Sequence, residues 1–188
     1  LAHKLFERMM TRLAGVILAA GKGSRMRSKK ANKVTLLLGG KPMVLHALNL
    51  LKRLQISPIV IVVGFAKESV KKIITGDVIF AEQKKRLGTA HALQTAIKVL
   101  PRVITDLLVI QGDDSAFYKE EALKALIKLH KRNNNSLTFL TVELENPRGL
   151  GRIIRDKKGQ VVAVVEEKDA TDSQRKIKEI NPACYVFT

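Results

Sequence analysis

A glycine-rich loop that carries two cations is the first candidate for chemistry. Gly21 and Gly23 follow directly after a short apolar run, and Lys22 and Arg25 stand among them. Glycine permits backbone angles and close approaches that a side chain would block, so such a loop can present several backbone N–H groups to one point. Together, N–H groups and positive side chains form a cradle for phosphate oxygens. The loop therefore predicts a phosphate-binding site.

The spacing of this loop excludes the two commonest glycine-loop motifs. The dinucleotide-binding pattern G-x-G-x-x-G would need a glycine where the chain has Met26, and the P-loop pattern G-x-x-x-x-G-K-[ST] does not occur. For the loop taken alone, a strand-to-loop turn with no ligand stays open as an alternative.

The charge of the chain narrows its possible partners. The 188 residues carry 34 basic and 17 acidic side chains, a net charge of +17. A surplus of this size suits anionic partners. The cations are spread along the sequence, and only 4% of the residues are aromatic, which gives few platforms for stacking bases. A small polyanionic substrate is therefore favoured over nucleic acid.

Cysteine content and hydropathy bear on the compartment. Cys184 is the single cysteine, so no internal disulfide can form and a reducing cytoplasm is expected. No apolar run approaches the roughly 20 residues of a membrane span, so no membrane association is expected. Residues 1–12 are basic and amphipathic but have no small-residue cleavage site. We interpret them as an extension before a domain over 13–188.

Apolar runs and helical spacing predict the elements that would position the loop. Continuous apolar runs are typical of buried parallel strands, and the strands and helices alternate along the first half of the chain. This order predicts an α/β fold of the Rossmann-like, doubly wound type, with a mostly parallel sheet. The expected strands are 16–20, 58–64, 78–81 and 107–110, and the expected helices are 41–55, 67–75, 90–100 and 120–132.

The second half of the chain has a different texture. Short alternating strands and turns predict an α+β elaboration on the doubly wound core. The expected elements are a strand over 137–144, a hairpin of 152–155 with 161–165, a polar helix over 172–179 and a last strand over 181–187.

An acidic turn follows the fourth expected strand. Asp113 and Asp114 come directly after Gln111 and Gly112, where the apolar run stops. In open α/β sheets ligands bind outside the carboxyl ends of the strands, so this turn is in the right place for a ligand site. Asp114 has two interpretations: it joins a metal site, or it caps the next helix, and the cap is favoured because aspartate in a turn is commonly a turn former.

Several motifs occur in the same order as in a known family. They are LAAGKGSRM, Lys33, FAEQ followed by LGTAHA, QGD, PRGLGRI and VEEKDATDSQRKIKEIN, and they extend over nearly all of residues 13–187. In these motifs the chain resembles the sugar nucleotidyltransferases. The last motif is most similar to that of the bacterial N-acetylglucosamine-1-phosphate uridylyltransferases.

This resemblance implies a role for each matching residue. Arg25 and Lys33 would hold the triphosphate of UTP, Asp113 would carry Mg²⁺, and Gln83 would hydrogen-bond the uracil edge. Further substrate-binding positions implied by the resemblance are Leu18, Ala19, Ala20, Gly21, Gly88 and Thr89 for the nucleotide, Gln111 and Gly112 of the QGD motif, and Gly151, Glu166 and Asn181 for the sugar.

The chemistry of such a reaction fits the residue types present. A phosphate monoester is largely dianionic at neutral pH, because its second pKa is about 6. Its oxygen can therefore attack the α-phosphorus of UTP without a general base or a nucleophilic side chain. Charge neutralisation and in-line positioning are what the reaction needs, and lysine, arginine and carboxylate-held Mg²⁺ supply them.

The chain also departs from the pattern of the family. Pro182 and Ala183 stand where the family commonly has Thr-Gly, and the larger alanine side chain is expected to narrow the sugar site. The family's catalytic domain extends beyond the length of this chain, and a second Mg²⁺ ligand normally comes from that further part. The domain over 13–188 is therefore expected to be incomplete at its carboxyl end.

Three alternatives to a UTP-dependent N-acetylglucosamine-1-phosphate uridylyltransferase stay open. The chain could be a non-catalytic module that binds nucleotide-sugars, because it stops short of the second metal ligand. It could use another sugar 1-phosphate or another base. It could also be a basic nucleic-acid-associated protein, whose affinity for RNA or DNA would fall steeply with salt.

Overall fold

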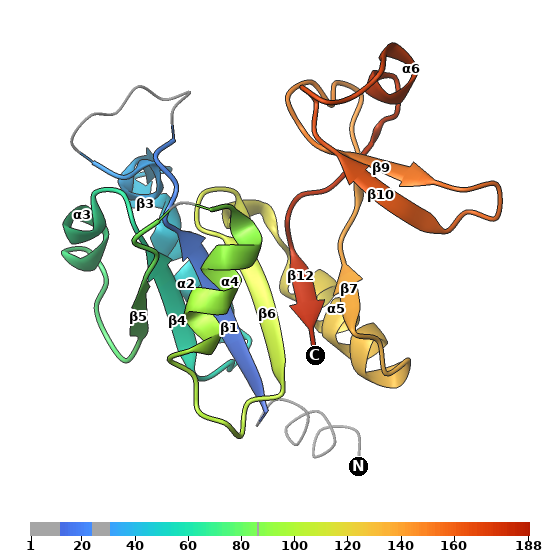
Figure 1. Cartoon of the computed structure of the whole chain (residues 1–188). Helices are drawn as coiled ribbons and strands as arrows, with labels where there is room; N and C mark the ends of the chain where they lie inside the picture. Colours follow the sequence, from blue (N-terminus) through green and yellow to red (C-terminus); the bar gives the residue numbers. More distant parts are fainter. Residues whose placement is uncertain (1–11, 24–30, 86) are drawn as a thin grey trace. The chain divides into compact units, whose positions relative to one another are not determined.

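The structure is a computed structural model that describes residues 12–23, 31–85 and 87–188 (Figure 1). Chain contacts divide it into two units, which are described separately. The first contains the described residues up to Thr138 together with Tyr185–Thr188, and the second is Phe139–Cys184. The expected extension over 1–12, apart from its last residue, and the expected phosphate ligand Arg25 lie outside the described residues.

A six-stranded sheet in the order β5-β4-β1-β6-β12-β7 forms the centre of the first unit. The pairings β1–β4, β1–β6 and β4–β5 are parallel, and β12 pairs antiparallel with β6. The strands are β1 (Leu13–Ala19), β4 (Ile59–Val63), β5 (Ile79–Glu82), β6 (Asp106–Gln111), β7 (Leu137–Phe139) and β12 (Tyr185–Phe187). The mostly parallel sheet predicted from the sequence is therefore confirmed.

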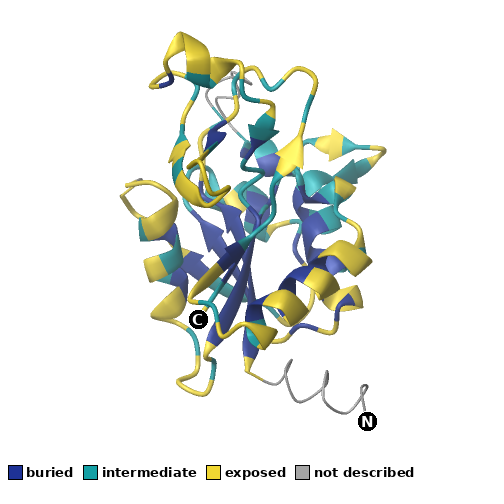
Figure 2. Cartoon of the chain, turned by 90° about the vertical axis from the view of Figure 1, so that its right-hand side faces the viewer, coloured by how far each residue is buried: buried dark blue, intermediate teal, exposed yellow. Residues whose placement is uncertain are grey.

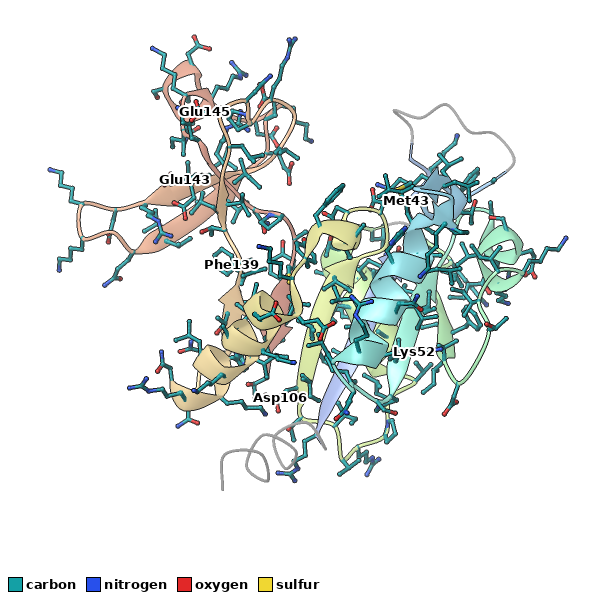
Figure 3. All side chains as sticks on the ribbon, turned by 180° about the vertical axis from the view of Figure 1, so that it is seen from behind. Met43, Lys52, Asp106, Phe139, Glu143 and Glu145 are labelled. Carbon is teal, nitrogen blue, oxygen red and sulfur yellow. The ribbon has the colours of Figure 1, made fainter. Side chains whose placement is uncertain are left out.

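Helices cover both faces of this sheet. Figure 1 shows α4 in front of the central strands, and Figure 3, drawn from behind, shows α2 in front of the same strands and α5 in front of β12. The helical segments of this unit are α2 (Met43–Arg53), α3 (Lys67–Lys71), α4 (Thr89–Ile97), α5 (Glu120–Arg132) and the short 3₁₀ turns η2 (Lys33–Thr35) and η3 (Ser115–Phe117). This arrangement confirms the doubly wound α/β class.

The strand β1 shows why the sequence run before the glycine loop is continuously apolar. Its even-numbered residues pack in one core with Ala92 and Ala96 of α4. On the other face, a Cβ atom added to Gly15 would lie 2.6 Å from Cδ1 of Leu51 in α2, so the helix approaches the backbone closely. Every residue of β1 is buried (Figure 2), because helices lie on both sides of it.

A tight hairpin lies between η2 and α2. It joins β2 (Leu37–Leu38) to β3 (Lys41–Pro42) in antiparallel pairing. The two turn residues, Gly39 and Gly40, have φ angles of +58° and +77°, a left-handed conformation that glycine adopts without steric cost. The helix expected over 41–55 therefore begins only at Met43, because Lys41 and Pro42 form β3 and Pro42 is the N-cap of α2.

A buried polar cluster closes the amino-terminal edge of β6. Asp106, which is 2% exposed, binds Lys131 and accepts hydrogen bonds from the hydroxyls of Thr105 and Thr188. Burial alone would raise the pKa of Asp106, but these hydrogen bonds and the Lys131 charge outweigh it and lower the pKa. The imidazole of His130 contacts the hydroxyls of Thr138 and Thr188 at 3.0 and 2.9 Å, and burial lowers its pKa.

The second unit is a four-stranded antiparallel sheet in the order β10-β9-β11-β8. Its elements are β8 (Val142–Glu143), β9 (Arg152–Arg155), β10 (Val161–Val165), the short helix α6 (Asp172–Arg175) and β11 (Glu179–Ile180). The hairpin predicted over 152–155 and 161–165 is confirmed. In its turn Asp156 Oδ1 accepts hydrogen bonds from the N–H groups of Lys158 and Gln160 at 2.8 and 2.9 Å.

Some predicted boundaries in the second half are wrong. The strand expected over 137–144 is split between β7 and β8, which belong to different sheets. The helix expected over 172–179 ends at Arg175. Glu179 belongs instead to β11, where it pairs with Glu143 of β8. The last expected strand, over 181–187, begins only at Tyr185. Before it, the N–H of Asn181 donates to Gly151 O at 3.0 Å, and Ala183 has a φ of +57°, which is not a strand conformation.

The expected helix over 67–75 is also too long. The α-helix α3 ends at Lys71 with its C-cap at Lys72. The N–H of Ile73 donates to Val70 O, three residues back, at 3.2 Å. This is the spacing of a 3₁₀ turn and not of an α-helix. The apolar spacing in this segment did not mark this end.

Candidate active site

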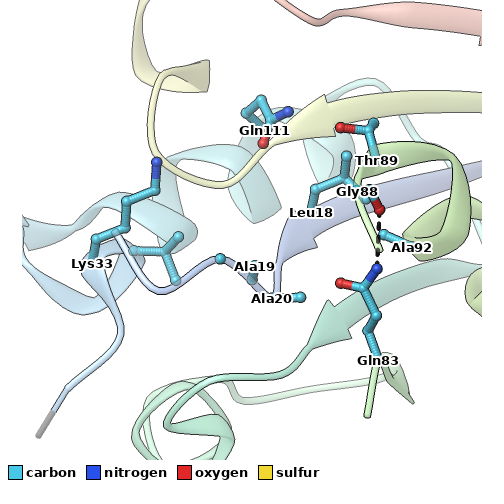
Figure 4. Close-up of a pocket in the computed structure, with 11 residues that line it drawn as sticks. Leu18, Ala19, Ala20, Lys33, Gln83, Gly88, Thr89, Ala92 and Gln111 are labelled. Atoms are coloured by element: carbon cyan, nitrogen blue, oxygen red, sulfur yellow. Dashed lines mark hydrogen bonds between the residues drawn. The ribbon is translucent and has the colours of Figure 1, made fainter. Parts of the chain in front are cut away.

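A cavity of about 330 Å³ lies at the carboxyl ends of β1, β5 and β6 (Figure 4). The sequence predicted most of its lining as substrate-binding positions, although those positions come from five separate segments. The cavity is lined by Leu18, Ala19, Ala20, Gly21, Lys33, Val34, Gln83, Gly88, Thr89, Ala92 and Gln111. The parallel sheet brings these segments together because its strand ends meet along one edge.

The two glycines of the loop have different roles. Gly23 has a φ of +60°, and a Cβ atom on it would lie 2.8 Å from Cβ of Lys33, so the loop can pass Lys33 only as glycine. A Cβ atom on Gly21 would meet nothing within 4 Å, and Gly21 lines the open cavity. The ammonium of Lys22 lies 5.9 Å from the ring centre of Phe65.

Lys33 is held in place by its neighbour Asn32. The Asn32 side chain is fully buried and donates to the carbonyl oxygens of Ala19 and Phe65, both at 2.8 Å. Its Oδ1 accepts from the N–H of Val34 at 3.2 Å and so caps η2. The buried amide therefore ties the end of β1 and the segment after β4 to the turn that carries Lys33.

The acidic turn after β6 meets the same lysine. The carboxylate of Asp113 forms an ion pair with the Lys33 ammonium, and both side chains are partly exposed. Gly112 sits between strand and turn, where its N–H donates to Leu18 O at 3.0 Å. A Cβ atom on Gly112 would lie 3.1 Å from both that oxygen and Cγ1 of Val34. Gly112 does not line the cavity, and its place in the turn rests on this close packing.

Asp114 does not cap the next helical segment, contrary to the favoured interpretation of the sequence. It occupies the N-cap position of η3 but makes no side-chain cap hydrogen bond. Its Oδ1 is buried and has no hydrogen-bond partner among the described residues. Burial, together with the charge of Asp113, raises the pKa of Asp114 to about 7. The other interpretation, a place in a metal site, stays a prediction.

Gln83 forms the far wall of the cavity. It follows β5 directly, is 5% exposed, and its N–H donates to Val63 O at 2.8 Å. The side-chain amide nitrogen donates to Gly88 O and contacts Nδ1 of His91, both at 3.0 Å. Gly88 stands at the N-cap of α4 with a φ of +91°, a conformation that requires glycine.

The residues expected at the sugar are gathered in the second unit. The N–H of Asn181 donates to Gly151 O at 3.0 Å, and a Cβ atom on Gly151 would lie 3.5 Å from Oε1 of Glu166. The side-chain oxygen of Asn181 accepts from the N–H of Ala183 at 2.9 Å. Gly151, Glu166 and Asn181 are therefore neighbours, and their role at the sugar stays a prediction.

An ion pair holds the turn that precedes Gly151. Arg152, which is 2% exposed, donates from Nη2 to Glu167 Oε2 at 2.6 Å. The same carboxylate oxygen accepts from the N–H of Gly149 at 3.1 Å. The hydrogen bond from Arg152 is the main cause of a lowered pKa at Glu167. These contacts fix the turn that leads into Gly151.

The donor set of the site suits Mg²⁺ held partly by substrate. Among the described residues, no group of three or more histidine, cysteine, aspartate or glutamate side chains could hold a metal ion. Asp113 offers one carboxylate at the strand edge, beside the Lys33 ammonium. Mg²⁺ is commonly bound by one or two carboxylates together with substrate phosphates rather than by a protein cage, so Asp113 fits that role.

Sequence reasoning missed four residues of this site. Val34 and Ala92 line the cavity, Asn32 holds the Lys33 turn, and His91 contacts Gln83. Val34 follows the predicted Lys33, and Ala92 and His91 stand inside the LGTAHA motif, whose predicted contacts were limited to Gly88 and Thr89. Asn32 carries no comparable signal, because its partners Ala19 and Phe65 come from distant segments.

The parallel sheet, the helices on both faces and the pocket at the strand ends define an α/β protein of the nucleotide-diphospho-sugar transferase fold. Solved structures share it. A putative glucose-1-phosphate thymidylyltransferase from Bacillus anthracis, in complex with a sucrose, superposes with a TM-score of 0.78 at 22% identity, over 93% of this chain and 71% of that one. A UDP-glucose pyrophosphorylase complexed with UDP-glucose gives 0.77 at 18% identity, over 93% and 75%.

The chain belongs to the nucleotidyl transferase family, whose model matches residues 14–188. A relative from Caldicellulosiruptor saccharolyticus, named bifunctional protein GlmU, is 46% identical over 174 residues, which is 92% of this chain and 37% of the relative. A protein of the same name from Syntrophomonas wolfei is 41% identical over 177 residues, 94% and 39%. The chain therefore spans less than two-fifths of the length of these relatives. No helix in the described part is long and apolar enough to span a membrane.

Proposed function

We propose that this chain carries the site of a uridylyltransferase that joins UTP to N-acetylglucosamine 1-phosphate, giving UDP-N-acetylglucosamine and pyrophosphate. The observation that carries the proposal is the single cavity that gathers the glycine loop, Lys33, Gln83 and Gly88 at the carboxyl edge of the sheet. The ion pair of Lys33 with Asp113 beside it adds the charges that phosphate chemistry uses. The motif resemblance to N-acetylglucosamine-1-phosphate uridylyltransferases supports the choice of base and sugar.

The proposed reaction exchanges one phosphoanhydride bond for another. A phosphate oxygen of the sugar 1-phosphate forms a bond to the α-phosphorus of UTP, and the bond from that phosphorus to the bridging oxygen of the β-phosphate breaks. The electron pair leaves with pyrophosphate, and no proton has to be removed from the attacking dianion. The chain therefore has to position two phosphorylated reactants and neutralise their charge.

The described residues divide these tasks. The Lys33 ammonium, held by the buried Asn32 turn, neutralises phosphate charge at the cavity edge. Gln83 and the glycine at position 88 receive the base at the opposite wall. Arg25, outside the described residues, is proposed as the second cation for the triphosphate.

Metal and sugar have their own residues. Asp113 would hold Mg²⁺, which supplies Lewis-acid stabilisation of the phosphate charge when bound. Gly151, Glu166 and Asn181 are proposed to bind the N-acetylglucosamine group, because their backbone and side-chain contacts already make them neighbours. Each of these roles is a separate target for substitution.

The experiment is a substrate matrix. Four nucleoside triphosphates are combined with N-acetylglucosamine, glucose and mannose 1-phosphates, with and without Mg²⁺, and pyrophosphate and nucleotide-sugar are measured. We expect product from UTP and N-acetylglucosamine 1-phosphate, only when Mg²⁺ is present. Product from another pair would show that the substrates are not the proposed ones. Binding of a UDP-sugar in calorimetry without turnover would show that the chain is a binding module. Salt-sensitive binding of RNA without nucleotide transfer would contradict the proposal.

A further inference from the structure

The side-chain amide of Gln83 is fixed by two partners. Its nitrogen lies 3.0 Å from Gly88 O and 3.0 Å from Nδ1 of His91. A carbonyl oxygen can only accept a hydrogen bond, so the amide nitrogen, and not its oxygen, must face Gly88. The orientation of this amide therefore follows from the backbone.

The same geometry fixes the tautomer of His91. The amide nitrogen has two N–H groups, of which one points to Gly88 O, and the other faces Nδ1 of His91. Nδ1 must then accept, so the ring proton of the neutral imidazole is on Nε2. His91 is in the first turn of α4 and is half-buried, and its bond to Gln83 spans the loop between β5 and this helix.

The remaining polar atom of the Gln83 side chain is its oxygen, Oε1, which can only accept. Gln83 lines the cavity, and Figure 4 shows Oε1 directed away from Gly88 toward the side on which Ala20 lies. In uracil, ring position N3 carries a hydrogen and donates; in cytosine, N3 carries none and accepts. An acceptor fixed in the cavity therefore attracts uracil and repels cytosine at this position.

We propose that His91 is a positioning residue that sets base specificity: it holds the Gln83 amide so that an acceptor faces N3 of the base. This inference rests on the proposed function, because it assigns the base to the cavity wall formed by Gln83. His91 itself does not contact the nucleotide and acts only through Gln83. Two hydrogen bonds, rather than one, then oppose the amide flip that would admit a cytosine.

The test compares the dissociation constants of UTP and CTP for the full chain by calorimetry. His91→Phe keeps a flat ring but removes the acceptor, and we expect it to lower the preference for UTP over CTP by about five- to tenfold, the weight of one neutral hydrogen bond. His91→Asn places a short acceptor near the position of Nδ1 and should restore most of the preference. Equal preference in His91→Phe and in the unsubstituted chain would overturn the inference.

A double-substitution cycle separates this role from general damage to the fold. Gln83→Leu should itself remove most of the preference, and adding His91→Phe to it should change the UTP-to-CTP ratio no further. If His91→Phe lowers the ratio by the same factor in the Gln83→Leu background as in the unsubstituted chain, His91 does not act through Gln83. His46→Phe is the matched control and should leave the ratio unchanged. His46 lies on α2, and its Nε2 contacts Leu38 O in β2 at 3.0 Å.

A second measurement needs no variant. Nitrogen NMR of the imidazole in the unsubstituted chain should show the proton of His91 on Nε2. The tautomer protonated on Nδ1 would overturn the inference, whatever the variants do. The proposed function is judged separately, because a chain that binds neither UTP nor CTP contradicts the nucleotide site itself, whereas a chain that prefers UTP regardless of residue 91 contradicts only the role of His91.

Discussion

The strands β1 and β10 are both short and contain only apolar residues, yet they have opposite environments. All residues of β1 are buried, because strands pair with it on both sides and helices cover both faces. Val161, Val162 and Val164 of β10 are exposed, with 60% of Val162 accessible. β10 is the edge strand of its sheet and, in the part of the chain that the structure describes, pairs with β9 alone.

This difference shows which contacts hold the candidate site residues in each unit. In the first unit the cavity stands at the ends of strands locked in a packed core, so Lys33 and Gln83 are held by buried contacts. In the second unit the residues proposed to bind the sugar lie among turns and ion pairs, such as Arg152 with Glu167 and Arg155 with Glu179. Substitutions should therefore have larger effects on chemistry and stability in the first unit.

The largest effect is expected at Asp113, the residue proposed to hold Mg²⁺. Asp113→Ala should lower the rate of nucleotide transfer by about 100-fold or more, because a preorganised charge at a reacting phosphate is commonly worth this much. Initial rates of pyrophosphate release measure it. Asp77→Ala removes an exposed aspartate of the same unit and should leave the rate unchanged. Full activity in Asp113→Ala would remove this residue from the reaction.

A smaller and more selective effect is expected in the second unit. Glu166→Gln should raise the KM for N-acetylglucosamine 1-phosphate by about tenfold, the weight of one charged hydrogen bond, while the KM for UTP stays the same. Steady-state kinetics with each substrate varied in turn provides the measurement. A rise in the KM for UTP instead would place Glu166 at the nucleotide. It would contradict the proposal that the first unit binds the nucleotide and the second unit binds the sugar.

The contrast between β1 and β10 can be tested with one substitution made twice. Val16→Thr buries an unpaired hydroxyl in a strand residue that is 0% exposed, and should lower the free energy of unfolding by about 1–3 kcal/mol. Val162→Thr leaves the hydroxyl in solvent and should change it by less than about 0.5 kcal/mol. Urea unfolding of both variants gives the two values, and similar losses would contradict the assigned difference in burial.

The two units should also respond to pH in different ranges. Burial lowers the pKa of His130, so the unfolded chain binds more protons at this site and stability falls as pH drops below about 6.5. The hydrogen bond from Arg155 lowers the pKa of Glu179, so its contribution is complete above 4.5 and is lost only at lower pH. Asp114 in the same unit as His130 acts in the opposite sense, because its raised pKa of about 7 lets the folded chain take up a proton as the pH falls. The His130 contribution is therefore measured as a difference: between pH 7.5 and 5 the unsubstituted chain should lose more protection from hydrogen exchange, or gain less, than His130→Leu.

The smallest effect concerns a residue that departs from the family pattern. Ala183 has a φ of +57°, which costs a non-glycine residue about 1 kcal/mol. Ala183→Gly should therefore raise the free energy of unfolding by about 0.5–1 kcal/mol, measured by thermal unfolding. In contrast, Ala163→Gly, in the strand β10, should lower it by a similar amount. Destabilisation by Ala183→Gly would show that the turn is not strained.

The sequence predicted the first unit well because its signals are local. Runs such as 59–63 are too apolar to be anything but buried strands, and the order of strands and helices then dictates a parallel sheet. The positions that line the cavity were implied by the resemblance to a family, and the parallel strands bring them together at one edge of the sheet.

The rest depended on contacts between distant segments. Nothing local in residues 176–180 says that Glu179 pairs with Glu143 rather than continuing a helix. Asp114 stands where an aspartate commonly caps a helix, yet its Oδ1 is buried without a partner among the described residues. The bonds of Asn32 to Ala19 and Phe65 join three segments, and only the folded chain reveals them.

The most direct test of the nucleotide site is a crystal structure of the chain with UTP and Mg²⁺. The account predicts the uracil ring inside the cavity of about 330 Å³, with N3 hydrogen-bonded to Oε1 of Gln83 and the phosphates beside the Lys33 ammonium. A nucleotide bound at another surface, or one whose phosphates lie away from Lys33, would contradict it.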